Sequence, residues 1–361
     1  MVSVQSFFKS IGICLFWIAV VFVFLYTPRF LQVTNADHSI NVCMWPGVVD
    51  PKIISAFEKE SGIKVNLSSF DGNEELLVKL FATKGRGYDL IVTSDYCIET
   101  LINNNLLKKI DKKKLNFWSA INPHFLGYYF DPKNEYSIPS DWYVLGFGIQ
   151  KNYFKNKKLP LPRWSCIFDL DHINYRMGVI NDSRELAGLA IHYLYGEVRL
   201  INDKEVKEVT DLLCRQKKNI EAYTDLRGDF LLKSGNCALV LVANNFIWRT
   251  LEEDDSIGFY LPEDGVFLNI ENFAIPKPSE KTDMTYELLN YLFKLDVQEH
   301  NFNNDSFLSV RKDATFMYEN PYLASSVALI DPNNPQRLPI FHNKLTDDQI
   351  NNIWLTVKGT N

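Results

Sequence analysis

Two acidic residues, Asp182 and Glu185, stand three positions apart in the stretch INDSRELAGLAIHYL (180–194), where a predicted strand runs into a predicted helix. An Asp at the N-cap and a Glu three residues later can each accept a hydrogen bond from an unpaired backbone N–H, as in a capping box. Carboxylates at a helix start can also bind a cation. We therefore expect both residues to start the helix and at least one of them to contact a cationic ligand.

Residue types that carry other chemistries are present, but not in recognisable patterns. None of the cysteines forms a C-x-x-C pair, and the six histidines are scattered singly, without H-E-x-x-H spacing. A G-x-S-x-G nucleophile motif is also absent from the sequence. The sequence therefore predicts no metal site, no cofactor and no disulfide framework, and it favours a non-enzymatic function. An exported enzyme is the least favoured of the alternatives.

The beginning of the chain differs in composition from the rest. Lys9 precedes the continuous apolar run IGICLFWIAVVFVFLYT (11–27). A basic segment followed by an apolar one is typical of export signals, so residues 1–35 are predicted to be a signal peptide or an N-terminal anchor. Cleavage is expected near Asn35 or Ala36. The protein is thus expected in the periplasm, either free after cleavage or held at the membrane by an uncleaved anchor.

The charge balance bears on the class of ligand. The chain has a formal net charge of −6. An acidic surface argues against nucleic acid and suits a cationic ligand. The basic run KKIDKKKL (108–115) is short and is interpreted as a solvated face.

The first part of the chain alternates predicted strands and helices. Strands are expected at 39–45, 64–70 and 88–94, and helices at 50–62 and 73–85. Such alternation is typical of βαβ units with a parallel sheet, in which ligands bind beyond the carboxyl ends of the strands. The residues expected at that rim are Trp45, Ser94, Asp95 and Tyr96.

Two apolar segments interrupt this order, and with 361 residues the chain suits two domains. The segments 136–150 and 269–278 are predicted to cross between lobes, near residues 146–149 and 269–273, and 283–296 is predicted to be a helix. We expect an α/β protein with two lobes, a hinge and an interlobe cleft. The expected lobes are 36–147 plus 271–314 for the first, and 148–270 plus 315–361 for the second.

Several local patterns occur in the order in which they occur in a known family. They resemble the spermidine/putrescine-binding type of periplasmic solute-binding proteins, which serve bacterial ABC importers. Besides Trp45 after the first strand, the patterns are FEKESGIKV (57–65), GYDLIVTSDY (87–96), LLKKIDKKKL (106–115), FDPKNEYSIP (130–139), NDSREL (181–186) and LPEDGVFLNIENFAIP (261–276). The resemblance implies a monomeric protein that binds a small cationic solute, a polyamine, between two lobes and delivers it to an inner-membrane ABC permease.

The resemblance also implies roles for individual residues. Asp182, Glu185 and Glu271 match acidic positions that bind ammonium groups. Ser94 and Tyr96 match rim residues beside the third strand. Trp45 and Phe307 match aromatic residues that line the ligand's methylene chain.

Other aromatic positions of the family are not preserved. Val48, Ala243 and Asn269 stand where family members commonly have aromatic walls, and Gly47 stands where an acid is common. The ligand is therefore either a polyamine held mainly by carboxylates or a different small solute bound by the same fold. The aromatic box could also be rebuilt from Trp142, Phe246 or Trp248.

Overall fold

The computed structural model describes residues 17, 38–160, 162–225, 227–342 and 344–360. The expected signal peptide or anchor, residues 1–35, lies outside the described residues except for position 17. Within the described part of the chain, no helix has both the length and the apolar character that a membrane span requires.

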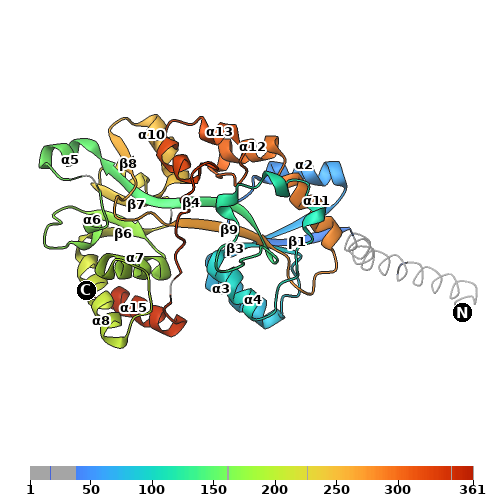
Figure 1. The fold of residues 1–361 in the computed structure, drawn as a ribbon, viewed down its shortest axis with the longest axis horizontal. Helices are drawn as coiled ribbons and strands as arrows, with labels where there is room; N and C mark the ends of the chain where they lie inside the picture. The colour runs from blue at the N-terminus through green and yellow to red at the C-terminus, as the bar shows by residue number, and fades with distance from the viewer. Residues whose placement is uncertain (1–16, 18–37, 161, 226, 343, 361) are drawn as a thin grey trace, which may run out of the picture.

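The first lobe is built on three parallel strands in the order β2-β1-β3 (Figure 1). The strands are β1 (Ser39–Met44), β2 (Lys64–Ser69) and β3 (Leu90–Ser94), and the helices between and after them are α2 (Pro51–Ser61), α3 (Asn73–Thr83) and α4 (Asp95–Asn103). The side chain of Asp50 caps α2, and Gly62 ends it with a φ of 75°, a conformation that favours glycine. This βαβ pattern confirms the parallel arrangement expected from the sequence.

The strand β4 (Ser137–Gln150) connects the two lobes. It pairs with β9 (Leu268–Ala274) up to Val144 and with β7 (Leu239–Ala243) from Leu145 onward. Within the described residues, nine strands thereby form one continuous sheet. At Gly146 a Cβ atom would lie 2.4 Å from the ring of Phe259, so only glycine allows this close approach.

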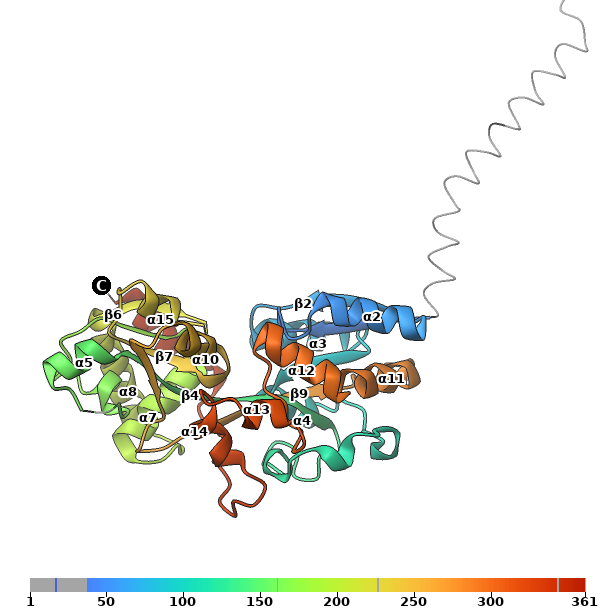
Figure 2. The ribbon, with the colours of Figure 1, turned by 90° about the horizontal axis from the view of Figure 1, so that it is seen from above.

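The second lobe surrounds the other half of the sheet. Its strands are β5 (Met177–Ile180), β6 (Ile220–Thr224), β7 and β8 (Ile257–Tyr260). Its helices are α5 (Lys151–Lys157), α6 (Ser165–Phe168), α7 (Ser183–Tyr195), α8 (Asp203–Gln216), α9 (Phe230–Lys233), α10 (Asn244–Glu253) and α15 (Asp347–Gly359). Seen from above, the helices of the two lobes form separate groups on either side of the bridging strands (Figure 2).

The segment after β9 returns to the first lobe. The helix expected at 283–296 is two helices, α11 (Thr282–Leu292) and α12 (Leu295–Asp305). The helix breaks because Lys294 has an extended backbone, with a ψ of 141°. The short helices α13 (Thr315–Tyr318) and α14 (Ala324–Val327) follow.

The packing of the C-terminal part is shared between the lobes. Met317 and Ile330 belong to the same hydrophobic core as the first-lobe strands, whereas α15 packs on α7 and α8 of the second lobe. Between them, Ile340 forms a β-bridge with Leu268, and the rings of Phe341 and Phe267 stack at 4.1 Å. The chain therefore passes between the lobes a third time, in addition to β4 and the segment leading into β9. The lobe boundaries given above stay a prediction.

Candidate ligand-binding site

The carboxyl ends of the first-lobe strands bring an aromatic residue and an acid together. Trp45 follows β1, and its Nε1–H donates to the Glu271 carboxylate of β9 at 3.0 Å. The other side of the indole packs on Phe70, with ring centroids 4.4 Å apart. Trp45 thus orients Glu271 as well as offering a ring face, a role that its type alone did not indicate.

Sheet register places three polar residues in one row. Ser94 at the end of β3 lies opposite Glu271 of β9, and Glu271 lies opposite Asp141 of β4. Residues directly opposite one another on antiparallel strands project from the same face. Neither Ser94 Oγ nor Asp141 Oδ1, both buried, has a hydrogen-bond partner among the described residues.

Tyr96, in the first turn of α4, contacts both lobes. Its hydroxyl donates to Glu74 of α3 at 2.9 Å, and the guanidinium of Arg184 from α7 lies over its ring, 4.5 Å from the centroid. Arg184 is also ion-paired with Asp347 at the start of α15, at 2.5 Å. Tyr96 is therefore a point at which the lobes meet, as well as a rim residue.

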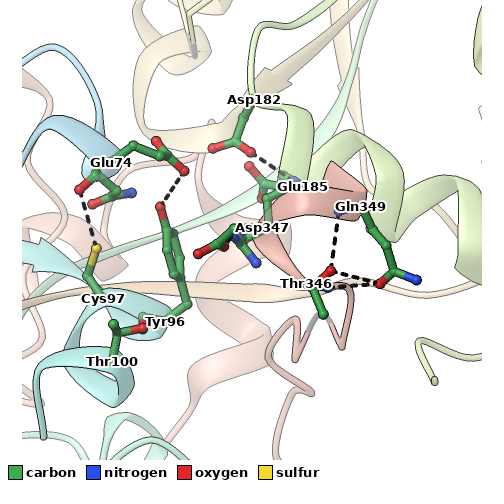
Figure 3. A network of polar contacts seen from close by, with 11 residues as sticks. Glu74, Tyr96, Cys97, Thr100, Asp182, Glu185, Thr346, Asp347 and Gln349 are labelled. Atoms are coloured by element: carbon green, nitrogen blue, oxygen red, sulfur yellow. Dashed lines mark hydrogen bonds and ion pairs between the residues drawn. The ribbon is translucent and has the colours of Figure 1, made fainter. Parts of the chain in front are cut away.

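The two carboxylates at the start of α7, Asp182 and Glu185, make different contacts. Asp182 is the N-cap and accepts a hydrogen bond from the Glu185 backbone N–H at 2.8 Å. The reciprocal bond of a capping box is not formed in the described structure, and Oε1 of Glu185, a residue only 9% exposed, has no partner. Both carboxylates lie across from Glu74 and Tyr96 (Figure 3). Asp182 therefore serves mainly the helix, while Glu185 is buried and available.

Burial and mutual repulsion disturb the ionisation of these acids. Burial raises the pKa of Glu271 to about 7, although the hydrogen bond from Trp45 opposes the increase. Burial also raises the pKa of Asp95 to about 8, against the effect of its bond from the Tyr96 N–H, and the charges of Glu271 and Asp182 add to the increase. Carboxylates in such surroundings hold protons near neutral pH unless a cation joins them.

The remaining acids follow the same pattern. The pKa of Glu185 lies well above its usual value because of burial and the nearby Asp182. Burial, then the charge of Glu271, raises the pKa of Asp141 well above its usual value. The Asp182 residue is exposed, yet neighbouring protein atoms displace enough water from its carboxylate to raise its pKa as well. The site therefore gathers five carboxylates with raised pKa values, and the charge of Arg184 partly opposes the increase at Asp182.

Comparison with known proteins identifies the family. The model of the family described as bacterial extracellular solute-binding protein matches residues 52–322. This chain belongs to that family.

Individual relatives agree with this assignment. The solute-binding protein is 28% identical over 255 residues to the spermidine/putrescine-binding periplasmic protein of Escherichia coli, covering 70% of this chain and 72% of that one. It is 25% identical over 344 residues to the putrescine-binding periplasmic protein PotF of Escherichia coli, covering 89% and 91%. A solved structure of a putative spermidine/putrescine ABC transporter protein from Listeria monocytogenes superimposes with a TM-score of 0.77 at 26% identity, covering 90% of this chain and all of that one.

The aromatic residues of the site differ from the expected set. Phe307 is buried, 4% exposed, directly after α12, but the contacts described above do not connect it with the carboxylates, so its role stays a prediction. Trp142 packs against Phe125 in the first-lobe core, and Trp248 stacks on Phe302 at 5.1 Å. These two indoles therefore fill the core of the solute-binding protein and do not rebuild an aromatic box.

One aromatic and one acid were missed by the sequence reasoning. Tyr143 lies opposite Asn269 in the β4–β9 register, and burial and the charges of Glu185 and Glu271 raise its pKa. Asp141 precedes it by two positions on the same strand. A polar residue at i and an aromatic at i+2 in an otherwise apolar strand share one face, and this alternation was the available signal.

The acids of the solute-binding protein are spread along the site. In the part of the chain that the structure describes, no three His, Cys, Asp or Glu side chains gather closely enough to hold one metal ion.

Proposed function

We propose that this solute-binding protein binds a linear polyamine between its lobes in the periplasm. It then delivers the polyamine, as a monomer, to an inner-membrane ABC permease. The observation that supports the proposal is the group of carboxylates around Glu271 and Glu185, which come from both lobes and whose pKa values are raised by burial. The names of the Escherichia coli relatives support the same class of ligand.

The chemistry of a polyamine matches this group. An ammonium group donates several hydrogen bonds, and each bond to a charged partner is worth about 1.5–3 kcal/mol. The ring face of Trp45 beside Glu271 can contact methylene groups and add cation–π attraction. A ligand held by acids of both lobes would also stabilise the closed arrangement of the lobes.

Identification of the bound molecule tests the proposal. Protein purified without denaturation should release a polyamine when it is denatured, detectable by mass spectrometry. Calorimetric titration of ligand-free protein with spermidine and putrescine should give saturable binding of at least one of them. Absence of both signals would exclude a polyamine ligand. A turnover assay with the bound molecule should show no product if the protein only binds.

A second candidate ligand has an anionic end. The guanidinium of Arg227 lies over the Phe246 ring, 4.6 Å from its centroid, and a Cβ atom on Gly47 would be 3.4 Å from Arg227 Nη2. The protein thus has its own cation beside the position where the family commonly has an acid. A solute with an ammonium at one end and a carboxylate at the other would suit this arrangement. Recovery of such a zwitterion, and its weaker binding to Arg227→Gln, would favour this alternative.

A further inference from the structure

Two acids of the site, Asp141 and Asp95, have no role assigned by the family resemblance. Asp141 belongs to β4 and Asp95 to the first turn of α4. Burial and the charge of Glu271 raise the pKa of both side chains. Since burying a carboxylate without a partner is costly, their presence needs an explanation.

The register of the sheet explains how Asp141 reaches the site. The β4–β9 pairing shifts between Pro139 and Asp141, a bulge that brings Asp141 directly opposite Glu271. Side chains so placed have Cβ atoms about 4.5–5.5 Å apart, and like charges at this spacing repel. A cation between the two carboxylates would turn this repulsion into attraction. The buried Asp141 Oδ1, which accepts no hydrogen bond in the described structure, is available for such a contact.

Asp95 faces the same space from the other side. It is 8% exposed, and its Oδ1 accepts one hydrogen bond, from the Tyr96 N–H at 2.7 Å. The charges of Glu271 and of Asp182 in the second lobe both act on it, whereas the charge that acts on Asp141 is that of Glu271. The sheet register gives the same order, because Asp141 lies opposite Glu271, Glu271 lies opposite Ser94, and Asp95 directly follows Ser94.

An independent observation at the start of α7 also indicates a ligand site. Glu185 is nine-tenths buried, and its Oε1 lacks a hydrogen-bond partner within the described residues. Asn269 on β9 lies close enough to favour the ionised form of Glu185 and so to oppose the increase in its pKa, but within the described residues no contact of hydrogen-bond geometry reaches Glu185 Oε1 or the buried Nδ2 of Asn269. A donor and an acceptor left unsatisfied at neighbouring positions indicate that a bound molecule completes both.

We propose that Asp141 and Asp95 form a further ammonium subsite with Glu271, so that the protein selects linear cations with three or more ammonium groups over diamines. The inference rests on the proposed function. A diamine can neutralise only part of the series and leaves the remaining buried carboxylates without partners. A triamine or longer chain can place one ammonium at each of three successive acids. It should therefore bind more tightly than a diamine, because it neutralises more of the carboxylates.

Titration calorimetry with a triamine and a diamine tests the selection. Wild-type protein is expected to bind spermidine at least tenfold more tightly than putrescine. Asp141→Asn and Asp95→Asn should each weaken spermidine binding tenfold or more, but putrescine binding less than threefold. The matched control is Asp283→Asn, which removes an exposed acid paired with Lys114 and should alter neither affinity.

The outcomes separate this inference from the proposed function. If wild type binds both amines equally, or if Asp141→Asn weakens both equally, the subsite is wrong while polyamine binding stands. If wild type binds neither amine, the subsite and the proposed function are both wrong.

A second measurement uses wild type alone, so that a misfolded variant cannot affect the result. Titrations at pH 7 in two buffers of different ionisation enthalpy should show more protons released by spermidine than by putrescine, and equal release would contradict the subsite.

Discussion

Glu271 is subject to two opposing influences. Burial favours its protonated form, while the indole N–H of Trp45, 3.0 Å away, favours the carboxylate. The result is a pKa of about 7, so the side chain exchanges its proton readily near neutral pH. An incoming ammonium needs only to displace a weakly held proton, and Trp45 keeps the carboxylate oriented while it does so.

The relative importance of charge and stacking can be measured on this pair. We expect Glu271→Gln to weaken polyamine binding by about 2–5 kcal/mol, roughly 30-fold to several thousand-fold, because it removes one partner of a desolvated ion pair. Trp45→Phe keeps a ring but loses the N–H and should cost less, with Trp45→Ala in between. Calorimetric titration of spermidine into the three variants gives the order. A larger loss for Trp45→Ala than for Glu271→Gln would show that stacking dominates.

The start of α7 illustrates how one element serves both fold and site. Its N-cap acid satisfies a backbone N–H of the helix, and three residues later Glu185 is left for another partner. The N-terminal end of the helix dipole favours anionic carboxylates at this position, which limits the cost of gathering them there.

Two substitutions at one position separate these functions. Asp182→Asn preserves a good N-cap without the charge, whereas Asp182→Ala removes both. We expect Asp182→Ala to lower the free energy of unfolding by about 0.5–2 kcal/mol and Asp182→Asn to leave it nearly unchanged. Both should weaken polyamine binding similarly. Urea unfolding together with calorimetry checks this, and normal binding by Asp182→Asn would restrict Asp182 to its capping role.

Elements governed by local sequence could be predicted, and those governed by long-range pairing could not. The strands and helices from 39 to 94 follow from apolar periodicity and from stops such as Gly62, whereas the helix α4 that comes next was not predicted. The meeting of Asp182, Glu185 and Glu271 was expected only through the family resemblance. Local alternation places Asp141 and Tyr143 on one face of their strand, but that Asp141 lies opposite Glu271 depends on a register shift between β4 and β9, which no local pattern encodes.

At the scale of the whole molecule, the two lobes are joined by the shared strand β4 and by charged and aromatic contacts around the site. Arg184 of the second lobe lies over Tyr96 of the first, and the passage near Ile340 and Phe341 connects the lobes behind it. Closing the lobes around the site removes its acids from water. The stability of the closed molecule is therefore coupled to the charge state of those acids and to any cation between them.

This coupling predicts an unusual dependence of stability on pH. Unfolded carboxyl groups have pKa values of about 4, whereas those of Glu271 and Asp95 are about 7 and about 8 in the folded protein. Between these limits the folded state binds more protons than the unfolded state, so stability falls as pH rises. We expect a lower melting temperature at pH 8 than at pH 5.5 without ligand. Glu271→Gln should show a smaller decrease.

A bound polyamine should counteract this loss. Its ammonium groups, with pKa values near that of lysine at about 10.4, stay charged across the window and favour ionised carboxylates. The increase in melting temperature caused by saturating spermidine should therefore be larger at pH 8 than at pH 5.5. Acids whose pKa is lowered by hydrogen bonds to the backbone, such as Asp50 and Glu58, affect stability only at more acidic pH and do not disturb the comparison. Scanning calorimetry at both pH values provides the test. An increase that is equal at both values would mean that the buried acids do not carry the binding.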